Sequence, residues 1–302
     1  MKVAVVGAGS IGIRHQIILK ELGYQVRVVS SKASDAEFRS LDDALTKEFF
    51  DYVVIASETS RHFVDLSTLI SRNFAGRVLI EKPLFEKSHQ IAAQNFRFLA
   101  VGYNLRFHPA VKWFKETKAK LGKISSANFY VGQYLPTWRP EIDYKKSSSA
   151  VDISGGGVLR DLSHELDLAR NMFGDWQCLT ALGGKFSNLE ISTDDTFSIL
   201  MKTNQCPVMS IQLNYLDRIK QRYVTVNGDN GTINIDLVSN KARFNESEVD
   251  FEVETNDTYI AQHQAIISCD LSNICTFDEA FNVVKTIEAI ELSTKSAQWI
   301  SK

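Results

Sequence analysis

The sequence has few cysteines and few prolines, and it contains no long apolar run. Its 302 residues include four cysteines and five prolines. No apolar run reaches the ~18 residues that a membrane-spanning helix needs. The cysteines (Cys178, Cys206, Cys269 and Cys275) lie far apart and without C-x-x-C spacing. This pattern predicts four reduced thiols and excludes both a disulfide scaffold and a zinc site.

Neither sign of charge is in excess. The chain carries 34 basic and 36 acidic residues, for a formal net charge of −2. Such a balance supplies no positive field for nucleic acid or for anionic lipid. The histidines show no metal-ligand spacing, and the apolar run at residues 3–6 is typical of a strand rather than of a signal peptide. We therefore expect a cytoplasmic protein without nucleic-acid, membrane or metal partners.

The pattern of expected strands and helices changes near residue 120. A length of 302 residues favours two domains. Short apolar runs alternate with helix-length segments in the first part, a pattern typical of a doubly wound parallel sheet. The expected strands are 3–6, 26–29, 52–56, 78–80 and 98–102, and the expected helices are 11–22, 41–48, 62–72 and 88–95. The predicted domains are 1–120 and 121–302.

Strands follow one another without intervening helices in the second part, which favours an antiparallel sheet. The expected strands are 124–135, 176–184, 196–202, 208–216, 222–227 and 232–238. Hairpin turns are expected at residues 203–204 and 228–231. One helix is expected over 158–173 and a long one from 277 to about 299. The predicted fold is an α/β Rossmann domain followed by an α+β domain with a large, mostly antiparallel sheet.

A glycine fingerprint begins the chain. Residues 3–12 (VAVVGAGSIG) run from a strand through G-x-G-x-x-G into a helix. Gly7 is expected to make the tight turn, Gly9 to let the backbone approach a pyrophosphate, and Gly12 to let the helix pack closely on the sheet. Ser10 and Ile11 begin this helix, whose free N–H groups favour phosphate. The pattern predicts a dinucleotide site, with a ligand-free glycine turn as the alternative.

The end of the second expected strand bears on the choice of dinucleotide. NAD enzymes usually place an acid there to hold the ribose 2′-hydroxyl. This chain instead has Ser30, Ser31 and Lys32, which suit a 2′-phosphate, and the next acid is Asp35. We expect NADP as the cofactor, with NAD as the alternative.

Three further motifs complete a resemblance to a known family. They are Glu81-Lys82-Pro83 after a strand, GYNLRF at 102–107, and three glycines at 155–157 followed by Asp161, His164 and Asp167. Together with the fingerprint, and in this order, they resemble the Gfo/Idh/MocA oxidoreductases over nearly the whole chain. The resemblance implies that Lys82 is the central catalytic residue. A lysine at the carboxyl end of a sheet strand is placed where such folds bind ligands, and it can stabilise a developing oxyanion.

The resemblance also implies that His164 transfers the hydroxyl proton, a task suited to imidazole. Asp161, one turn earlier on the same expected helix, would orient the ring or bind a substrate hydroxyl. In the family the aspartate usually precedes the histidine by four residues, where this chain has Arg160. Either residue therefore remains a candidate for that position. A structural histidine and a surface lysine are the alternatives for His164 and Lys82.

Other segments are expected to contact the ligands. The resemblance assigns to the cofactor Ser57, Glu58, Thr59, His62 and Glu81. The residues expected at the substrate are Asn104, Arg106, Trp138, Arg139, Tyr144 and Arg160, with Lys145 and Lys146 adding positive charge. Structural alternatives are a salt bridge for Arg106, a packing role for Tyr103, a structural contact for His62, and a subunit contact for the long loop 134–146.

These expectations converge on hydride transfer between a nicotinamide cofactor and a hydroxyl or keto carbon. The expected substrate is a sugar, a sugar acid or a nucleotide-linked sugar, and the basic residues favour an anionic one. The loop 134–140 resembles a branch associated with bacterial surface polysaccharides. The alternatives are a non-catalytic dinucleotide-binding regulator and a reductase of a non-sugar substrate. One sheet face without helices predicts a homodimer or homotetramer through it.

Overall fold

The protein is described by a computed structural model that covers the backbone of residues 1–302 and every side chain except that of Ile153. The chain folds into two compact units. The first comprises Met1–Phe107 and Thr255–Val284, and the second comprises His108–Glu254 and Lys285–Lys302. The segment 255–284, expected in the second domain, thus contributes to the first unit.

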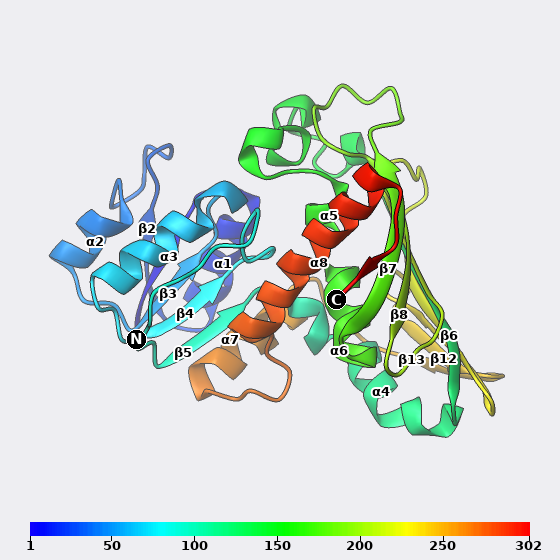
Figure 1. The fold of residues 1–302 in the computed structure, drawn as a ribbon. Coiled ribbons are helices and arrows are strands. Elements are labelled where there is room, and N and C mark those ends of the chain that lie inside the picture. Colours follow the sequence, from blue (N-terminus) through cyan, green and yellow to red (C-terminus); the bar gives the residue numbers. More distant parts are fainter. The chain divides into compact units, whose positions relative to one another are not determined.

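The first unit contains a five-stranded parallel sheet of order β2-β1-β3-β4-β5 (Figure 1). The strands are β1 (Lys2–Val6), β2 (Gln25–Val29), β3 (Tyr52–Ile55), β4 (Arg77–Ile80) and β5 (Phe98–Val101). The helices are α1 (Ser10–Glu21), α2 (Leu41–Lys47), α3 (His62–Ser71) and α7 (Asp257–Ser268), with short 3₁₀ turns η1 (Thr59–Arg61) and η2 (Asn104–Phe107). The predicted doubly wound sheet is confirmed.

Both faces of this sheet are buried. Val3 and Val5 of β1 form one core with Leu19 of α1 and Ile266 of α7. The alternate residue Ala4, which points to the opposite face, is also fully buried. Continuous β-branched runs are expected of strands covered on both sides, and they explain why these segments were recognisable from sequence.

The helix expected over residues 88–95 is wrong, because the segment 88–97 is irregular. Among residues 88–95, Ile91 is the one large apolar residue, and residues 92–95 are exposed. Eight residues with so little apolar surface to bury do not stabilise a helix. The segment is instead anchored by His89, which stacks on Phe63 with 4.1 Å between ring centroids.

The second unit contains a nine-stranded sheet of order β13-β12-β11-β10-β6-β9-β8-β7-β14. The strands are β6 (Ile124–Gly132), β7 (Trp176–Gly184), β8 (Thr196–Thr203), β9 (Met209–Asn214), β10 (Gln221–Gly228), β11 (Gly231–Asp236), β12 (Lys241–Phe244), β13 (Ser247–Asp250) and β14 (Ile300–Ser301). All pairings are antiparallel except β6 with β9. Gly228 pairs with Gly231 at the end of the predicted hairpin.

Helices cover one face of the large sheet (Figure 1). They are α4 (Pro109–Thr117), α5 (Val158–Asp161), α6 (His164–Phe173) and the second half of α8 (Phe277–Ser296). The continuous helix expected over 158–173 is wrong, because the chain turns at Leu162 and Ser163. Ser163 is the N-cap residue of α6, although its side chain makes no capping hydrogen bond. Asp161 and His164 therefore lie on different helices.

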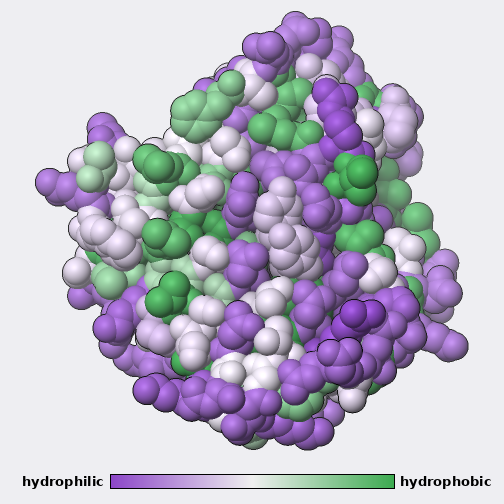
Figure 2. Space-filling view, turned by 90° about the vertical axis from the view of Figure 1, so that its right-hand side faces the viewer, coloured by the Kyte–Doolittle hydropathy of each residue, from purple (hydrophilic) through white to green (hydrophobic). Residues whose placement is uncertain are grey.

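The other face of the large sheet carries side chains that alternate with the buried ones. Leu182 and Leu200 project from it and are 75% and 48% exposed. Figure 2, which views the molecule from the side where this sheet lies in Figure 1, shows apolar residues scattered among polar ones. No helix among the described residues is long and apolar enough to cross a membrane.

Candidate functional site

Most of the residues predicted for the cofactor follow the carboxyl ends of the parallel strands. Gly7 follows β1, Ser30 follows β2, Ser57 follows β3, and Glu81 follows β4. Because parallel strands end at the same edge of a sheet, these segments share one edge of the first unit. Ligands bind at this edge in open α/β sheets.

The glycine fingerprint has the geometry of a dinucleotide turn. Gly7 has a φ of +111°, and a Cβ on it would lie 2.3 Å from the Ala56 carbonyl oxygen. A Cβ on Gly12 would lie 2.2 Å from the Gly7 oxygen, whereas one on Gly9 would meet nothing within 4 Å. Gly7 and Gly12 thus permit close packing, and Gly9 leaves open space beside the start of α1. No side chain caps that helix, so its N–H groups can receive an anion.

A basic residue and an acidic residue meet beside this turn. Lys32 Nζ, after β2, lies 2.7 Å from Glu58 Oε1, after β3. Ser30 Oγ accepts hydrogen bonds from the backbone N–H groups of Lys32 and Ala33. The Lys32 side chain is 80% exposed, so its pairing with Glu58 is weak and can be exchanged for a ligand.

His62 joins the loop after β3 to the loop after β4. Its Nε2 lies 3.1 Å from the Ser57 oxygen, and its Nδ1 lies 3.0 Å from the Pro83 oxygen. Burial lowers the pKa of this imidazole below its usual value. The ring therefore has a structural partner on each side. Lys82 precedes Pro83 through a cis peptide bond.

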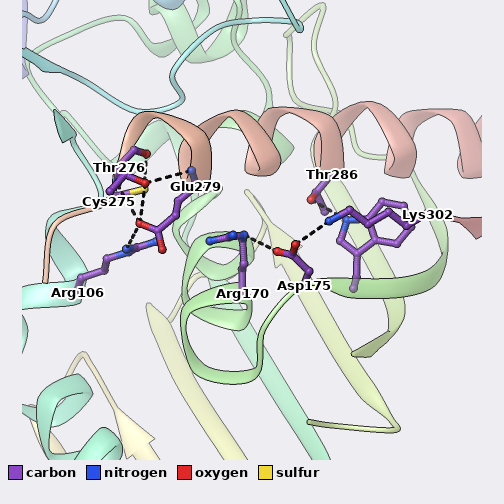
Figure 3. A network of polar contacts seen from close by, with 9 residues as sticks. Arg106, Arg170, Asp175, Cys275, Thr276, Glu279, Thr286 and Lys302 are labelled. Atoms are coloured by element: carbon purple, nitrogen blue, oxygen red, sulfur yellow. Dashed lines mark hydrogen bonds and ion pairs between the residues drawn. The ribbon is translucent and has the colours of Figure 1, made fainter. Parts of the chain in front are cut away.

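Two residues predicted for the substrate are buried inside the first unit. The Asn104 amide donates to Thr258 Oγ1 on α7 across 2.7 Å. The Arg106 guanidinium is 1% exposed, and its Nη1 lies 3.0 Å from Glu279 Oε2. Figure 3 shows Arg106 pointing at Glu279, which also accepts from the Thr276 backbone N–H. Because Glu279 N donates back to Thr276 Oγ1, this pair forms a capping box at the start of α8.

In the second unit, a tyrosine that the sequence did not single out connects two predicted residues. The buried Tyr215 hydroxyl donates to Asp161 Oδ2 across 2.6 Å. The Trp138 ring meets Tyr215 edge-on, with 5.2 Å between centroids. Burial raises the pKa of Tyr215 well above its usual value, so its hydroxyl remains a donor. The predicted substrate loop and the predicted catalytic aspartate thus share one side-chain partner.

The triple-glycine motif packs around a second acidic residue that the sequence did not single out. Asp194 Oδ1 accepts the Leu159 N–H at the start of α5. A Cβ on Gly157, whose φ is +111°, would lie 2.6 Å from Asp194 Oδ2, and one on Gly156 would lie 2.1 Å from the Ser148 oxygen. Burial raises the pKa of Asp194 to about 6. The glycines therefore make room for this carboxyl and for the loop before it.

The predicted basic residues of the second unit have several acidic partners. Arg160 Nη1 lies 2.6 Å from Glu291 of α8, and Lys145 Nζ lies 2.6 Å from Glu190. Arg139 and Lys146 form no ion pair with any described residue. With Arg106 paired in the first unit, the positive charge open to an anionic substrate is smaller than the sequence suggests.

The loop that contains Trp138 surrounds a small hollow. Its lining residues are Leu135, Trp138, Arg139, Ile142, Tyr144, Ser147 and Ser149. The Tyr144 oxygen accepts from the Glu190 backbone N–H across 3.3 Å. This bond and the Lys145–Glu190 pair attach the loop to the segment before β8. The loop is thereby held in one place despite having no strand and only short 3₁₀ turns.

His164 is the first residue of α6 and is 8% exposed. The next residue, Glu165, receives two hydrogen bonds from the Arg222 guanidinium of β10, which anchor this end of the helix to the sheet. Asp167 is also buried. Among the described residues, no group of His, Cys, Asp and Glu side chains is arranged to hold a metal ion.

Comparisons with known proteins agree with this architecture. Residues 117–234 match the model of the family described as the GFO/IDH/MocA C-terminal domain. The search of curated proteins gives no match. Among solved structures, GenD2 from gentamicin A biosynthesis, in complex with NAD, is 24% identical, with a TM-score of 0.82 and coverage of 100% of this chain and 96% of that one.

Two further structures share the fold at lower identity. Levoglucosan dehydrogenase, in complex with NADH and L-sorbose, is 15% identical with a TM-score of 0.84 and coverage of 100% and 98%. Myo-inositol 2-dehydrogenase from Lactobacillus plantarum is 17% identical with a TM-score of 0.80 and coverage of 100% and 99%.

The fold therefore combines a dinucleotide-binding type of α/β unit with a large, mostly antiparallel sheet. It is the fold that GenD2, levoglucosan dehydrogenase and myo-inositol 2-dehydrogenase have, and residues 117–234 match the model of the GFO/IDH/MocA C-terminal domain. The family resemblance predicted from the sequence is confirmed by this match over residues 117–234, which contain the triple-glycine motif.

Proposed function

We propose that the protein is an NAD(P)-dependent oxidoreductase that transfers a hydride between a nicotinamide cofactor and a hydroxyl or keto carbon of a sugar, a sugar acid or a nucleotide-linked sugar. The observation that carries the proposal is the placement of Lys82 at the same sheet edge as the open glycine turn. The sugar-type ligands and substrates of the structural neighbours support the substrate class.

The residues at the sheet edge fit a dinucleotide. The open space at Gly9 and the uncapped start of α1 would receive the pyrophosphate, with the N–H groups around Ser10 and Ile11 as donors. Ser57, Glu58 and Thr59 would line the nicotinamide half. We propose NADP, with Lys32 and the hydroxyls of Ser30 and Ser31 holding the 2′-phosphate. NAD, which GenD2 contains, is the alternative, with Glu58 as the acceptor for the 2′-hydroxyl.

The proposed chemistry assigns one task to each of three side chains. A bound nicotinamide supplies the acceptor or donor for the hydride. The Lys82 ammonium would hydrogen-bond the substrate oxygen, where negative charge develops during the transfer. The His164 imidazole would take the hydroxyl proton in oxidation and return it in reduction. Asp161, fixed by Tyr215, would orient the imidazole or bind a neighbouring hydroxyl.

Aromatic and basic side chains of the loop 134–146 would form the substrate pocket. Trp138 and Tyr144 would pack on a sugar ring, and Arg139 and Lys146 would hold an anionic group. Arg160 would contribute once a substrate displaces Glu291, which is 41% exposed. The proposed setting is the cytoplasm and the synthesis of bacterial surface polysaccharides, which the resemblance of this loop favours.

We further propose a homodimer or homotetramer through the open face of the large sheet. The exposed Leu182 and Leu200, on neighbouring strands, would be buried there. Light scattering at micromolar concentration should give a multiple of the 34.0 kDa chain mass. Leu200→Lys should weaken the assembly, whereas Val238→Lys, at an exposed position after β11, should not.

A substrate screen tests the proposed function. Polyols, sugar acids and nucleotide sugars, together with their keto forms, would be incubated with the oxidised or reduced cofactor. We expect a change in the absorbance of the reduced cofactor with at least one sugar-type compound. Activity only with a cyclic imine or diene would reject the substrate class, and dinucleotide binding without turnover would favour a regulator.

A further inference from the structure

Four buried side chains of the first unit form a continuous hydrogen-bonded chain that ends next to Lys82. The Tyr52 hydroxyl of β3 lies 2.9 Å from His263 Nδ1 of α7. His263 Nε2 lies 2.9 Å from His15 Nδ1 of α1. His15 Nε2 lies 3.0 Å from Glu81 Oε1, after β4. The chain thus links the sheet, two helices and the segment that carries Lys82.

No member of this chain has more than slight access to water. Tyr52, His15 and His263 are fully buried, and Glu81 is 6% exposed. Burial and the neighbouring His15 lower the pKa of His263 well below its usual value, and burial raises the pKa of Tyr52 well above its own. His263 is therefore neutral and the Tyr52 phenol keeps its proton at pH 7. A neutral imidazole has one N–H to donate and one nitrogen to accept with, whereas a charged one donates from both nitrogens.

Only one direction of donation satisfies every group. Tyr52 O–H donates to His263 Nδ1, His263 Nε2–H donates to His15 Nδ1, and His15 Nε2–H donates to Glu81. In this order Glu81 accepts at both oxygens, at Oε1 from His15 and at Oε2 from the Lys82 N–H, as a carboxylate does, whereas a protonated carboxyl would need an acceptor for its own hydrogen. In the reverse order, with either a protonated Glu81 or a charged His15, His263 Nδ1–H donates to the Tyr52 oxygen, and the Tyr52 hydrogen then has no acceptor among the described side chains. An unsatisfied buried hydroxyl is unfavourable, so the phenol sets the direction of the chain.

The far oxygen of Glu81 contacts the backbone of the next residue. Lys82 N–H lies 3.4 Å from Glu81 Oε2, so the carboxylate folds back over its own peptide. A Cβ on Gly102, the residue after β5, would lie 2.5 Å from Glu81 Oε1, which shows how closely the backbone there approaches this carboxyl group. The end of the chain is therefore both confined and adjacent to the proposed catalytic lysine.

We propose that Tyr52, His263 and His15 are positioning residues that hold Glu81 as an oriented carboxylate beside Lys82. The inference rests on the proposed function for the role of Lys82, but the ionisation state of Glu81 depends only on the four hydrogen-bonded side chains. A fixed negative charge here favours the ammonium form of Lys82, the form that can donate to a substrate oxygen.

Other titratable groups also face this cluster. They are Lys82 itself, His62 of α3, Arg77 of β4, and Tyr259 of α7, whose ring meets His15 edge-on at 5.8 Å. Arg77 donates to the carbonyls of Ile266 and Ile267, and Arg14 stacks over Tyr259. None of these groups replaces the Tyr52 hydroxyl as the donor to His263 in the described hydrogen bonds.

The test follows the ionisation of Glu81 directly. The side-chain carboxyl carbons of glutamate would be labelled with ¹³C, and the Glu81 signal would be assigned by its loss in Glu81→Gln. We expect Tyr52→Phe to raise the midpoint of the Glu81 titration by about one pH unit, because His263 Nδ1 then lacks a partner in either direction and no phenol favours the order that ends on a carboxylate. Tyr24→Phe, a control in the same unit that lies outside the chain, should leave the midpoint unchanged.

A second measurement applies to the unaltered protein, so the test does not depend on a variant that folds. In ¹⁵N spectra at pH 7, His15 and His263 should both carry their proton on Nε2. A proton on Nδ1 of either ring, or an unchanged Glu81 midpoint in Tyr52→Phe, would overturn the proposal.

Dinucleotide binding separates this inference from the proposed function. The pH dependence of the NADPH dissociation constant should shift in Tyr52→Phe in parallel with the Glu81 midpoint. An unshifted dependence would reject the positioning role. If the wild type binds neither NADPH nor NADH while Glu81 titrates as expected, the proposed function fails and the hydrogen-bonded chain stands.

Discussion

The Tyr215 hydroxyl donates to Asp161 Oδ2 across 2.6 Å within the second unit. Tyr215 directly follows β9, and Asp161 ends the short helix α5, so the bond fixes the aspartate to the sheet. Because α5 ends at Asp161 and α6 begins at His164, no continuous helix fixes the position of one side chain relative to the other. The hydrogen bond from Tyr215 holds the Asp161 carboxylate in place instead.

Removal of this hydroxyl should impair the proposed proton transfer. A hydrogen bond to a charged group is worth about 1.5–3 kcal/mol, so we expect Tyr215→Phe to lower kcat at least about tenfold. Tyr130→Phe is the matched control, since the Tyr130 hydroxyl of β6 donates to Asp217 in the loop after β9. Equal losses of kcat in both variants would mean that the Tyr215 bond has only a structural role.

The Lys32–Glu58 pair should set the cofactor preference. Loss of the ammonium in Lys32→Ala should weaken NADPH about tenfold or more and leave NADH nearly unchanged, because only the former carries a 2′-phosphate. Glu58→Gln should strengthen NADPH binding by removing a competing carboxylate. Fluorescence titration measures all four dissociation constants.

The opposite pattern of affinities would identify NAD as the cofactor. Tighter NADH binding by the wild type, together with a loss of NADH affinity in Glu58→Gln, would identify Glu58 as the acceptor for the 2′-hydroxyl. Lys47→Ala, which removes an exposed lysine paired to Asp43 in α2, controls for a general change of charge.

Asp194 should make stability depend on pH. Its pKa is about 6 in the folded protein and near 3.9 when unfolded, so the folded state binds the proton more tightly. Its stabilising contribution is complete below about pH 4 and is lost as the pH rises to about 6, a change of roughly 3 kcal/mol. Asp194→Asn keeps the acceptor for Leu159 N–H and should lose this dependence.

Urea denaturation at pH 5 and pH 8 measures the effect. The free energy of unfolding of Asp194→Asn minus that of the wild type should be larger at pH 8 than at pH 5, because only the wild type loses stability over this range. Asp229→Asn, in the hairpin turn between β10 and β11, should show no such difference. A parallel response of the wild type and Asp194→Asn at both pH values would contradict the proposed cause.

Substitution of Arg106 should lower the stability of the fold rather than only the affinity for a substrate. Its buried guanidinium pairs with the Glu279 carboxylate at the start of α8, and Arg106→Met leaves that carboxylate without its cation. Breaking such a pair should cost about 3 kcal/mol in the free energy of unfolding. Arg97→Met, at an exposed position, should cost little. If Arg106→Met raises KM without lowering stability, Arg106 acts as a substrate ligand instead.

The sequence predicts the features that local chemistry controls. The glycine turn at Gly7–Gly12 and the hairpin at Gly228–Gly231 need particular backbone conformations and close approaches, which only a few residue types allow. The buried strands of the first unit are equally predictable, because continuous β-branched runs are typical of strands that are covered on both faces.

Contacts between distant residues leave no such local signal. Tyr52 and His263 are 211 positions apart, and the sequence around each is ordinary for a strand and a helix. Tyr215 and Asp161 are 54 positions apart and are brought together by the packing of α5 against β9. The break at Leu162–Ser163 and the irregular segment 88–97 depend on what each segment packs against. Periodicity alone therefore predicted one helix that is absent and one that is too long, and it did not predict α4 and α7.

The central claim is hydride transfer at a centre that contains Lys82. Reduced nicotinamide cofactor with deuterium at both C4 positions would be incubated with the keto sugars of the screen, and mass spectrometry would follow the products. The wild type should give a sugar alcohol with one carbon-bound deuterium, and Lys82→Ala should lower that rate at least about a hundredfold with little change in cofactor affinity. The exposed Lys87→Ala should match the wild type. Deuterium transfer by Lys82→Ala at the wild-type rate, or its absence from every wild-type product, would contradict the account.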